Sequence, residues 1–184
     1  MKHTSVVAGM LLLLWAVELK AQGSAPKPGP EHRKMEAWLG SWIWTYENKG
    51  SPDPQAPPAG KCTLKEKDEM LGGFFVIRQV DGECNGLPEK VVSIMRWDAS
   101  RKAYVLSEFN NHGAFEDFTI AQNGPEWSLV DVGTAGGQKY WHRCSWTFNP
   151  NGTRIAMKCV DSKDGKSWTV TGEGQWAKAA ANAR

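Results

Sequence analysis

The feature that most constrains this chain is a series of short segments in which polar and apolar residues alternate, each followed by turn residues. About ten such segments follow one another after Gly40, at spacings typical of an all-β sandwich or barrel. Most of the turns are short, and short turns join antiparallel neighbours. A meander leaves two unpaired edges unless it closes, so we predict a single antiparallel up-and-down β-barrel of about ten strands.

Turn signals and alternation together set the expected strand bounds. The sequence NPNG at residues 149–152 is a strong hairpin signal, and Asn-Gly or Gly-Gly pairs mark other turns. The strands are expected over residues 41–47, 62–70, 74–80, 91–97, 103–110, 114–121, 127–132, 139–148, 154–160 and 167–176.

One short helix is expected before the first strand, over Glu31–Leu39. Met35, Trp38 and Leu39 are spaced to form a single apolar stripe along it. Gly40 follows directly and would end the helix as a C-terminal cap. Such a helix would plug or cover one end of the barrel.

The first 21 residues are typical of a secretory signal peptide. Lys2 gives a basic start, Val6–Val17 is an apolar core of 12 residues, and small Ala21 precedes the expected cleavage point. That core is too short to cross a bilayer as a helix; an uncleaved membrane anchor is the alternative. We expect a flexible Pro-rich lead-in over 22–30, the barrel domain over 31–176 and a disordered tail over 177–184.

Four cysteines in the expected mature chain agree with export, because an oxidising compartment favours disulfides. Three pairings are possible, and four buried free thiols are the alternative. Cys144 and Cys159 would face each other across the hairpin at 149–152 if pairs about its Asn-Gly sum to 303; a one-residue shift at Pro150 would instead put them on opposite faces. Cys62 and Cys84 flank a Gly-Gly turn with a parity that needs one bulge. We therefore expect Cys62–Cys84 and Cys144–Cys159, in a secreted or periplasmic protein without a transmembrane span.

Composition and motifs exclude several classes of protein. The 184 residues carry a formal net charge of +2, without the basic stripe that a nucleic-acid binder needs. Apolar residues make up 41% of the chain, which excludes a disordered protein. Because no HExxH, GxSxG or P-loop motif occurs, we assign no catalytic residue and no metal. Residues 65–69 (KEKDE) are interpreted as a solvated strand face.

Aromatic residues supply the candidate ligand site. Three of them share one side of the first strand, and four others lie on strands expected to face the same interior. A barrel of this size either fills its inside with side chains or holds one small ligand, and aromatic walls suit a flat, apolar ligand. The candidate ligand-binding residues are Trp42, Trp44, Tyr46, Trp97, Tyr104, Trp127 and Trp146, together with Glu108 as a polar group.

Two histidines are candidates for chemistry. Glu108 and His112 lie at alternating positions and would form an acid/base pair if that face points inward. His112 falls in an expected turn, which favours the outward reading. His142, between Trp141 and Arg143 on a strand, is a candidate haem or metal ligand; a core or rim histidine with one hydrogen bond is the alternative.

The helix followed by Gly40-Ser41-Trp42 resembles the GxW signature of the calycins, which include lipocalins, fatty-acid-binding proteins and nitrobindin-like barrels. The chain also looks like a secreted bacterial family of unknown function built on that barrel. Further short matches are GPEH at 29–32, LGGF at 71–74, WD at 97–98 and KAY at 102–104. The resemblance implies a calycin-like barrel with an internal cavity and no established reaction. Neither the lipocalin Arg of the last strand nor the Gly-rich repeat of haem barrels is present.

These observations favour an exported, non-enzymatic carrier of a small apolar or aromatic ligand. The ligand would enter at the mouth away from the helix and stack on Trp44, Trp97, Tyr104 and Trp146. No cofactor is expected, with haem as the alternative. An enzyme or haem protein that uses His142, or Glu108 with His112, is the second class. A structural or partner-binding envelope protein with a filled barrel is the third.

Overall fold

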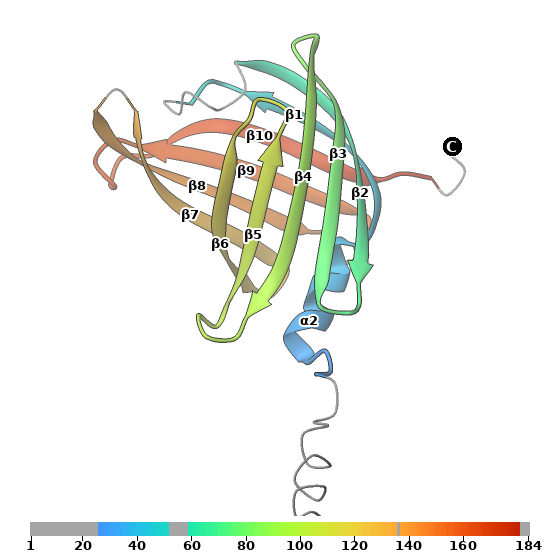
Figure 1. The fold of residues 1–184 in the computed structure, drawn as a ribbon. Coiled ribbons are helices and arrows are strands. Elements are labelled where there is room, and N and C mark those ends of the chain that lie inside the picture. Colours follow the sequence, from blue (N-terminus) through green and yellow to red (C-terminus); the bar gives the residue numbers. More distant parts are fainter. Residues whose placement is uncertain (1–25, 52–58, 136, 181–184) are drawn as a thin grey trace, which may run out of the picture.

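The computed structural model describes residues 26–51, 59–135 and 137–180, and it shows a closed antiparallel barrel of ten strands (Figure 1). The expected fold class is confirmed. The strands are β1 (Gly40–Asn48), β2 (Gly60–Leu71), β3 (Phe75–Cys84), β4 (Leu87–Asp98), β5 (Ala103–Asn110), β6 (Phe115–Asn123), β7 (Glu126–Ala135), β8 (Gln138–Phe148), β9 (Arg154–Ser162) and β10 (Thr169–Lys178).

Each strand pairs with its neighbours in the sequence, and the first strand also pairs with the last. Trp44 of β1 lies opposite Leu64 of β2 on one side and opposite Trp176 of β10 on the other. No edge strand remains, as a closed meander requires. Side chains alternate between the interior and the solvent, most regularly along β2.

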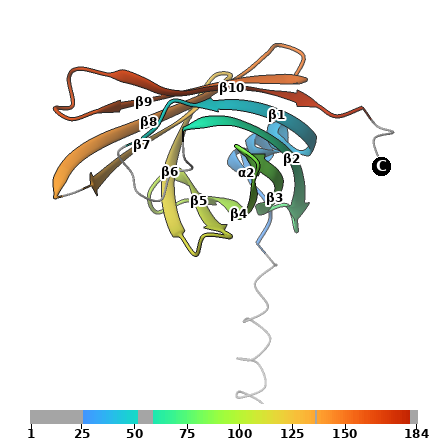
Figure 2. The same cartoon turned by 90° about the horizontal axis from the view of Figure 1, so that it is seen from above.

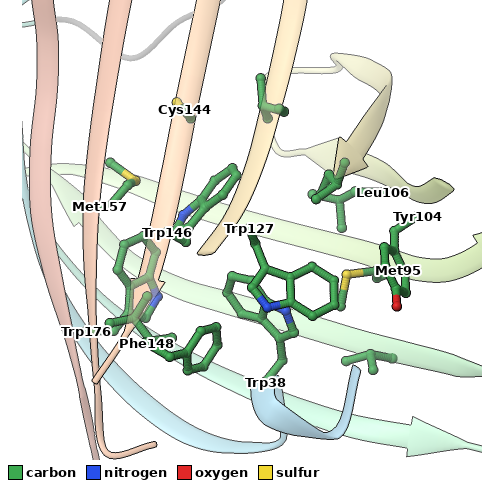
Figure 3. Close-up of a cluster of buried hydrophobic side chains, with 14 of the residues drawn as sticks. Trp38, Met95, Tyr104, Leu106, Trp127, Cys144, Trp146, Phe148, Met157 and Trp176 are labelled. Carbon is green, nitrogen blue, oxygen red and sulfur yellow. The ribbon is translucent and has the colours of Figure 1, made fainter. Parts of the chain in front are cut away.

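A short helical segment closes one end of the barrel (Figures 1 and 2). It consists of α2 (Pro30–Lys34) and a 3₁₀ turn, η1 (Met35–Trp38), where a single α-helix is expected from the sequence. The apolar stripe is confirmed in part, since Met35 and Trp38 are fully buried. Figure 3 shows the Trp38 ring among the aromatic side chains of the barrel, and it lies 4.9 Å from the ring of Phe148.

The barrel extends slightly beyond its expected C-terminal end. β10 runs to Lys178, whose backbone N–H donates to the carbonyl of Thr153 at 3.0 Å. The next residue, Ala179, donates to Ser41. The expected signal peptide, residues 22–25 of the lead-in and the last four residues lie outside the described residues. None of the helices in the described part of the chain is long and apolar enough to cross a membrane.

Both expected disulfides are present, Cys62–Cys84 and Cys144–Cys159. Cys144 and Cys159 lie directly opposite each other, as the sum of 303 predicts. Cys62 and Cys84 are also directly opposed, but the expected bulge is wrong. The β2–β3 turn has three residues, 72–74, between the paired Leu71 and Phe75, and this odd number restores the parity. Two glycines with positive φ, 61° and 79°, make that turn possible.

The interpretation of residues 65–69 as a solvated face is wrong for two of them. Lys65, Lys67 and Glu69 point outward, whereas Glu66 and Asp68 point into the barrel and are each 3% exposed. Alternation along β2 forces this split, because successive side chains leave opposite faces of the sheet.

Candidate functional site

The interior of the barrel has a filled part and a hollow part. Near η1, the rings of Trp38, Trp42 and Trp127 are almost fully buried and pack edge to face with their neighbours. Figure 3 shows Trp38 and Trp127 in this part of the interior. Farther from η1 lies a cavity of about 240 Å³. The cavity is the candidate functional site, because it is the concave interior space into which both aromatic and ionisable side chains project.

The walls of the cavity come from seven strands, β1 and β5 to β10, and from the start of the loop after β1. Apolar residues line the side toward the filled part, and polar residues line the side toward the open end. The lining residues are Trp44, Tyr46, Asn48, Ser51, Leu106, Glu108, Glu116, Phe118, Leu129, Asp131, Tyr140, His142, Cys144, Trp146, Met157, Cys159 and Thr171.

The cavity meets solvent where β6 and β7 part. The two strands are paired only from Ile120 to Asn123 and from Glu126 to Leu129. Beyond those residues, Glu116 and Phe118 of β6 and Asp131 of β7 line the cavity from separate strands. Asp131 is exposed, so this end of the barrel, opposite α2, gives access to the interior.

Acidic groups dominate the charge of the cavity. Glu108, Glu116 and Asp131 line it, and none of its described lining residues is Lys or Arg. Burial, opposed in part by Arg78 and reinforced by Glu116, raises the pKa of Glu108 to about 7. Near neutral pH this carboxyl is therefore divided between its protonated and ionised forms. The site favours a neutral or cationic ligand group.

Two aromatic side chains form the floor and one side of the cavity. Trp44 stacks on Trp176, with ring centroids 4.5 Å apart and an angle of 9° between the planes. The indole Nε1 of Trp44 is buried and finds no hydrogen-bond acceptor among the described residues. Tyr46 lies beside it, and burial together with the Asp161 charge raises its pKa to about 12. The Trp44 indole N–H and the Tyr46 hydroxyl, which stays protonated at neutral pH, can therefore both donate a hydrogen bond to a ligand.

His142 is fixed by a carboxylate behind it. Its Nδ1 lies 2.5 Å from Oδ1 of Asp161, and its Nε2 lies 3.1 Å from Sγ of Cys144. Asp161 is itself held by the hydroxyls of Ser51 and Thr171, at 3.1 and 3.3 Å. The ring orientation is thus set by hydrogen bonds from β9, β10 and the loop after β1.

The structure divides the candidate residues from the sequence between three places. Trp44, Tyr46, Glu108, Trp146 and His142 line the cavity. The others in the interior, Trp42, Trp97, Tyr104 and Trp127, belong to the filled part or pack against it.

His112 lies in neither interior region. It sits in the turn after β5, with Nε2 2.9 Å from Glu89 Oε2. It does not pair with Glu108, so the structure does not assemble the acid/base pair considered from the sequence. The outward reading of His112 agrees with its half-exposed side chain.

Three donor atoms near the cavity meet the spacing of a metal site, those of His142, Cys144 and Cys159, within 4.8 Å of one another. The two sulfur atoms are bonded to each other in the disulfide, whereas a metal requires thiolates. In this oxidised form the group is therefore a disulfide beside a histidine.

A buried ionic cluster lies next to the filled part and outside the cavity lining. Arg78 donates to Glu66 from Nε and Nη2, at 3.2 and 2.6 Å, and its Nε is 3.5 Å from Asp68. Glu66 also accepts from the indole of Trp176 at 3.1 Å. Burial and the neighbouring Glu66 charge raise the pKa of Asp68 to about 8. The Arg78 guanidinium thus contacts one ionised carboxylate, Glu66, and one carboxyl that is largely protonated at neutral pH, Asp68.

Two wider depressions lie on the outside of the barrel, with volumes of about 810 and 520 Å³. Their side chains are the outward residues of β1–β4 and β8–β10, such as Lys65, Lys158 and Glu173. Mixed charges and open walls make them ordinary curved sheet surface, despite their larger volume. The smaller interior cavity remains the better candidate, because its walls enclose a ligand.

Sequence reasoning missed the two acids beside His142, namely Asp131 in the cavity lining and Asp161 behind the ring. Both are direct neighbours of His142 across the sheet, on β7 and β9. The hairpin sum of 303 that pairs the cysteines also pairs His142 with Asp161. That signal was therefore present in the sequence.

Comparison with known proteins places the fold but no activity. Residues 27–114 match the model of a family described as a protein of unknown function, DUF1579. No curated protein matches the chain. Among solved structures 16 chains match, and one is Rv2717c from M. tuberculosis, with 14% identity, a TM-score of 0.56, and coverage of 84% of this chain and all of that chain. The chain is thus similar over 27–114 to a family of unknown function, and it shares its barrel fold with Rv2717c.

Proposed function

We propose that this chain is an exported carrier that binds a small aromatic ligand, bearing an amine or another donor group, in the interior cavity. The observation that carries the proposal is the cavity itself, walled by Trp44 and Trp146 and edged by Glu108. A calycin-like relationship and a non-enzymatic role are part of this proposal.

Size limits the ligand. A dry apolar cavity of about 150 Å³ holds one benzene molecule, and this cavity is about 240 Å³. The space suits a single ring with a short substituent. Stacking against indole faces would hold the ring.

Charge selects the substituent. Three carboxyl groups and no Lys or Arg belong to the described lining, so an anionic ligand would meet only repulsion apart from His142. An ammonium group near Glu108 would favour the ionised carboxylate and lower its pKa. Binding of an amine would therefore release a proton near neutral pH.

Export is supported by the two disulfides, which are typical of oxidising compartments. Haem on His142 is the less favoured alternative, because both ring nitrogens already face a partner, Asp161 and Cys144. A fully packed structural barrel is less favoured because the cavity is present.

The test compares three probes of matched size: phenethylamine, phenethyl alcohol and phenylacetate. Calorimetry on the exported protein should give the tightest binding for the amine and the weakest for the carboxylate. Native mass spectrometry of protein from its own exported fraction would show any resident ligand. Equal affinity for amine and carboxylate would contradict the charge argument.

Two variants locate the binding. Leu129→Trp should fill the cavity and abolish binding, whereas Val132→Trp, on the outer face of the same strand, should leave it unchanged. Glu108→Gln keeps the volume and should remove the preference for the amine over the alcohol. If Leu129→Trp binds the probes normally, while circular dichroism shows a native barrel, the cavity is not the site.

A further inference from the structure

We propose that Cys144–Cys159 is a redox-active disulfide that exchanges with low-molecular-weight thiols, and that His142 serves as the acid and base for the Cys144 sulfur. The proposal goes beyond ligand carriage and does not depend on it. It requires only that a small thiol reach the cavity.

The first support is the position of the imidazole. His142 Nε2 lies 3.1 Å from Cys144 Sγ, and Asp161 holds Nδ1 from the opposite side at 2.5 Å. The Asp161 carboxylate can only accept, so Nδ1 donates to it and Nε2 is the ring nitrogen that faces the sulfur. Nε2 is therefore placed to exchange a proton with the sulfur of Cys144.

The second support is the rigidity of the group behind the imidazole. Asp161 is buried and accepts hydrogen bonds from the hydroxyls of Ser51 and Thr171. Because that carboxylate is fixed, the imidazole cannot turn away without losing its partner. The order carboxylate, imidazole, sulfur is the arrangement that activates cysteine nucleophiles.

The third support is access. His142, Cys144 and Cys159 all line the interior cavity of about 240 Å³. That space admits a thiol of a few heavy atoms, and it opens to solvent between β6 and β7. A reductant therefore need not unfold the barrel to reach these sulfur atoms.

The reaction balances with two thiol molecules. A thiolate attacks Cys159 Sγ, the Cys144–Cys159 bond breaks, and its electron pair goes to Cys144 Sγ, which takes the proton from His142 Nε2. A second thiolate attacks the outer sulfur of the resulting mixed disulfide, and the Cys159 thiolate leaves. The two protons that the small thiols released to solvent on ionising return, one to Cys159 Sγ and one to His142 Nε2. The protein gains two thiols, and the two small thiols are oxidised to one disulfide.

The other disulfide provides an internal contrast. Cys62–Cys84 lies in an apolar cluster with Leu64 and Val80. Within the described residues, neither of its sulfur atoms has a hydrogen-bond partner. An attack there would expel a thiolate into apolar surroundings with no acid to protonate it. The same chain thus carries one disulfide equipped for exchange and one that is not.

Among the described residues, the other ionisable groups that line the cavity around His142 or contact its ring are acids or phenols. They come from β1 (Tyr46), β5 (Glu108), β6 (Glu116), β7 (Asp131), β8 (Tyr140) and β9 (Asp161). This acidic surround favours cysteamine over the anionic thiol mercaptoacetate as the attacking molecule.

The test measures which disulfide opens first. The oxidised full chain is treated with mercaptoethanol or cysteamine in native buffer, quenched with acid, alkylated and mapped by peptide mass spectrometry. Cys144 and Cys159 should be alkylated about tenfold or more faster than Cys62 and Cys84. Equal rates for the two pairs would overturn the proposal.

Two histidine variants separate chemistry from structure. His142→Gln should slow opening of Cys144–Cys159 by about tenfold or more and flatten the acid side of its pH profile, with Cys62–Cys84 unchanged. His112→Gln, at the rim, should change neither. Asp161→Asn tests the positioning role and should shift the same pH profile.

The outcomes remain separate from those of the ligand proposal. Fast exchange without binding of phenethylamine would uphold the redox site and reject the carrier. Phenethylamine binding with a normal exchange rate in His142→Gln would do the reverse. If His142→Gln fails to fold, the relative rates of the two disulfides in the unmodified protein still decide the proposal.

Discussion

Aromatic side chains line the interior at both ends of the barrel, but they fill the space at one end and leave a cavity at the other. At the end closed by η1, Trp38, Trp42 and Trp127 fill the space, and Arg78 lies over the Trp38 ring at 4.6 Å. At the other end, Trp44 and Trp146 line a cavity of about 240 Å³. The same residue type is packing material at one end and a wall at the other. The difference is the helical plug, which supplies a side chain to one end only.

This division implies that stability and function are separated along the barrel axis. The filled end combines the largest buried rings with the buried Arg78 cluster. The hollow end has the carboxyl groups, the histidine and the disulfide that a ligand or thiol would meet. Four predictions test the separation, beginning with the largest expected effect.

Removal of the plug should be the most destabilising change. Trp38→Ala would leave a cavity among Trp127, Trp146 and Phe148, and should lower the free energy of unfolding by about 3–5 kcal/mol. Phe118→Ala, at the cavity, should cost roughly half as much, because its ring lacks neighbours on one side. Chemical denaturation measures both, and equal losses would break the comparison.

The two disulfides should contribute similar amounts to the free energy of unfolding, although we expect them to react with thiols at different rates. They close loops with sequence separations of 22 and 15 residues, so loop entropy assigns each about 3 kcal/mol. Cys62→Ala with Cys84→Ala, and Cys144→Ala with Cys159→Ala, should each lower the free energy of unfolding by about that amount. If only one of the two double variants lowers the free energy of unfolding, loop entropy in the unfolded chain does not determine what these disulfides contribute.

A buried carboxyl at the filled end should make stability depend on pH. Burial raises the pKa of Asp68 from 3.8 to about 8, so between these values the folded protein binds a proton that the unfolded chain has lost. The free energy of unfolding should therefore fall as pH rises through that window.

Asp68→Asn provides the check on that slope. It should remove most of the dependence and stabilise the barrel at pH 8 by about 1–3 kcal/mol, while Arg78 keeps its partner Glu66. Glu108, whose pKa rises from 4.5 to about 7, adds a contribution of the same sign over a narrower pH window. Denaturation curves across the range measure both, and a rising slope would contradict the assignment.

The rim of the hollow end should contribute least. His112 contacts Glu89 at 2.9 Å, and its side chain is 49% exposed. His112→Gln should lower the free energy of unfolding by less than about 1 kcal/mol, with the difference shrinking at high salt. A larger loss would mean that this rim shares in the packing of the barrel.

Sequence reasoning reached the fold, the direction of side chains along β1 and both disulfides, because each depends on alternation and hairpin parity. The sequence did not predict how far along the barrel axis each inward side chain lies. Trp97 and Tyr104 have the inward parity of Trp44, yet they lie toward the η1 end, packed against the core cluster. Where a side chain lies along the axis depends on the stagger of ten strands and on where Trp38 enters, and no single segment encodes either.

The charged interior was missed for another reason. Glu66 and Asp68 alternate with lysines in a segment whose composition is that of a solvent-facing strand. Their partner Arg78 comes from the next strand, so neither segment alone signals a buried ion pair. Parity about the β2–β3 turn, which pairs Asp68 with Arg78, is the signal that identifies it.

The helical plug also has a consequence for the order in which the chain can assemble. Trp38 packs against Phe148, which follows it by 110 residues, and β1 cannot complete its pairing until β10 has been made. Both are contacts of long sequence separation, which slow folding. During synthesis the apolar face of η1 therefore stays exposed until the last third of the chain, which contains Trp127, Trp146 and Phe148, has been made. Until then, a holding chaperone that binds exposed apolar segments could cover this face.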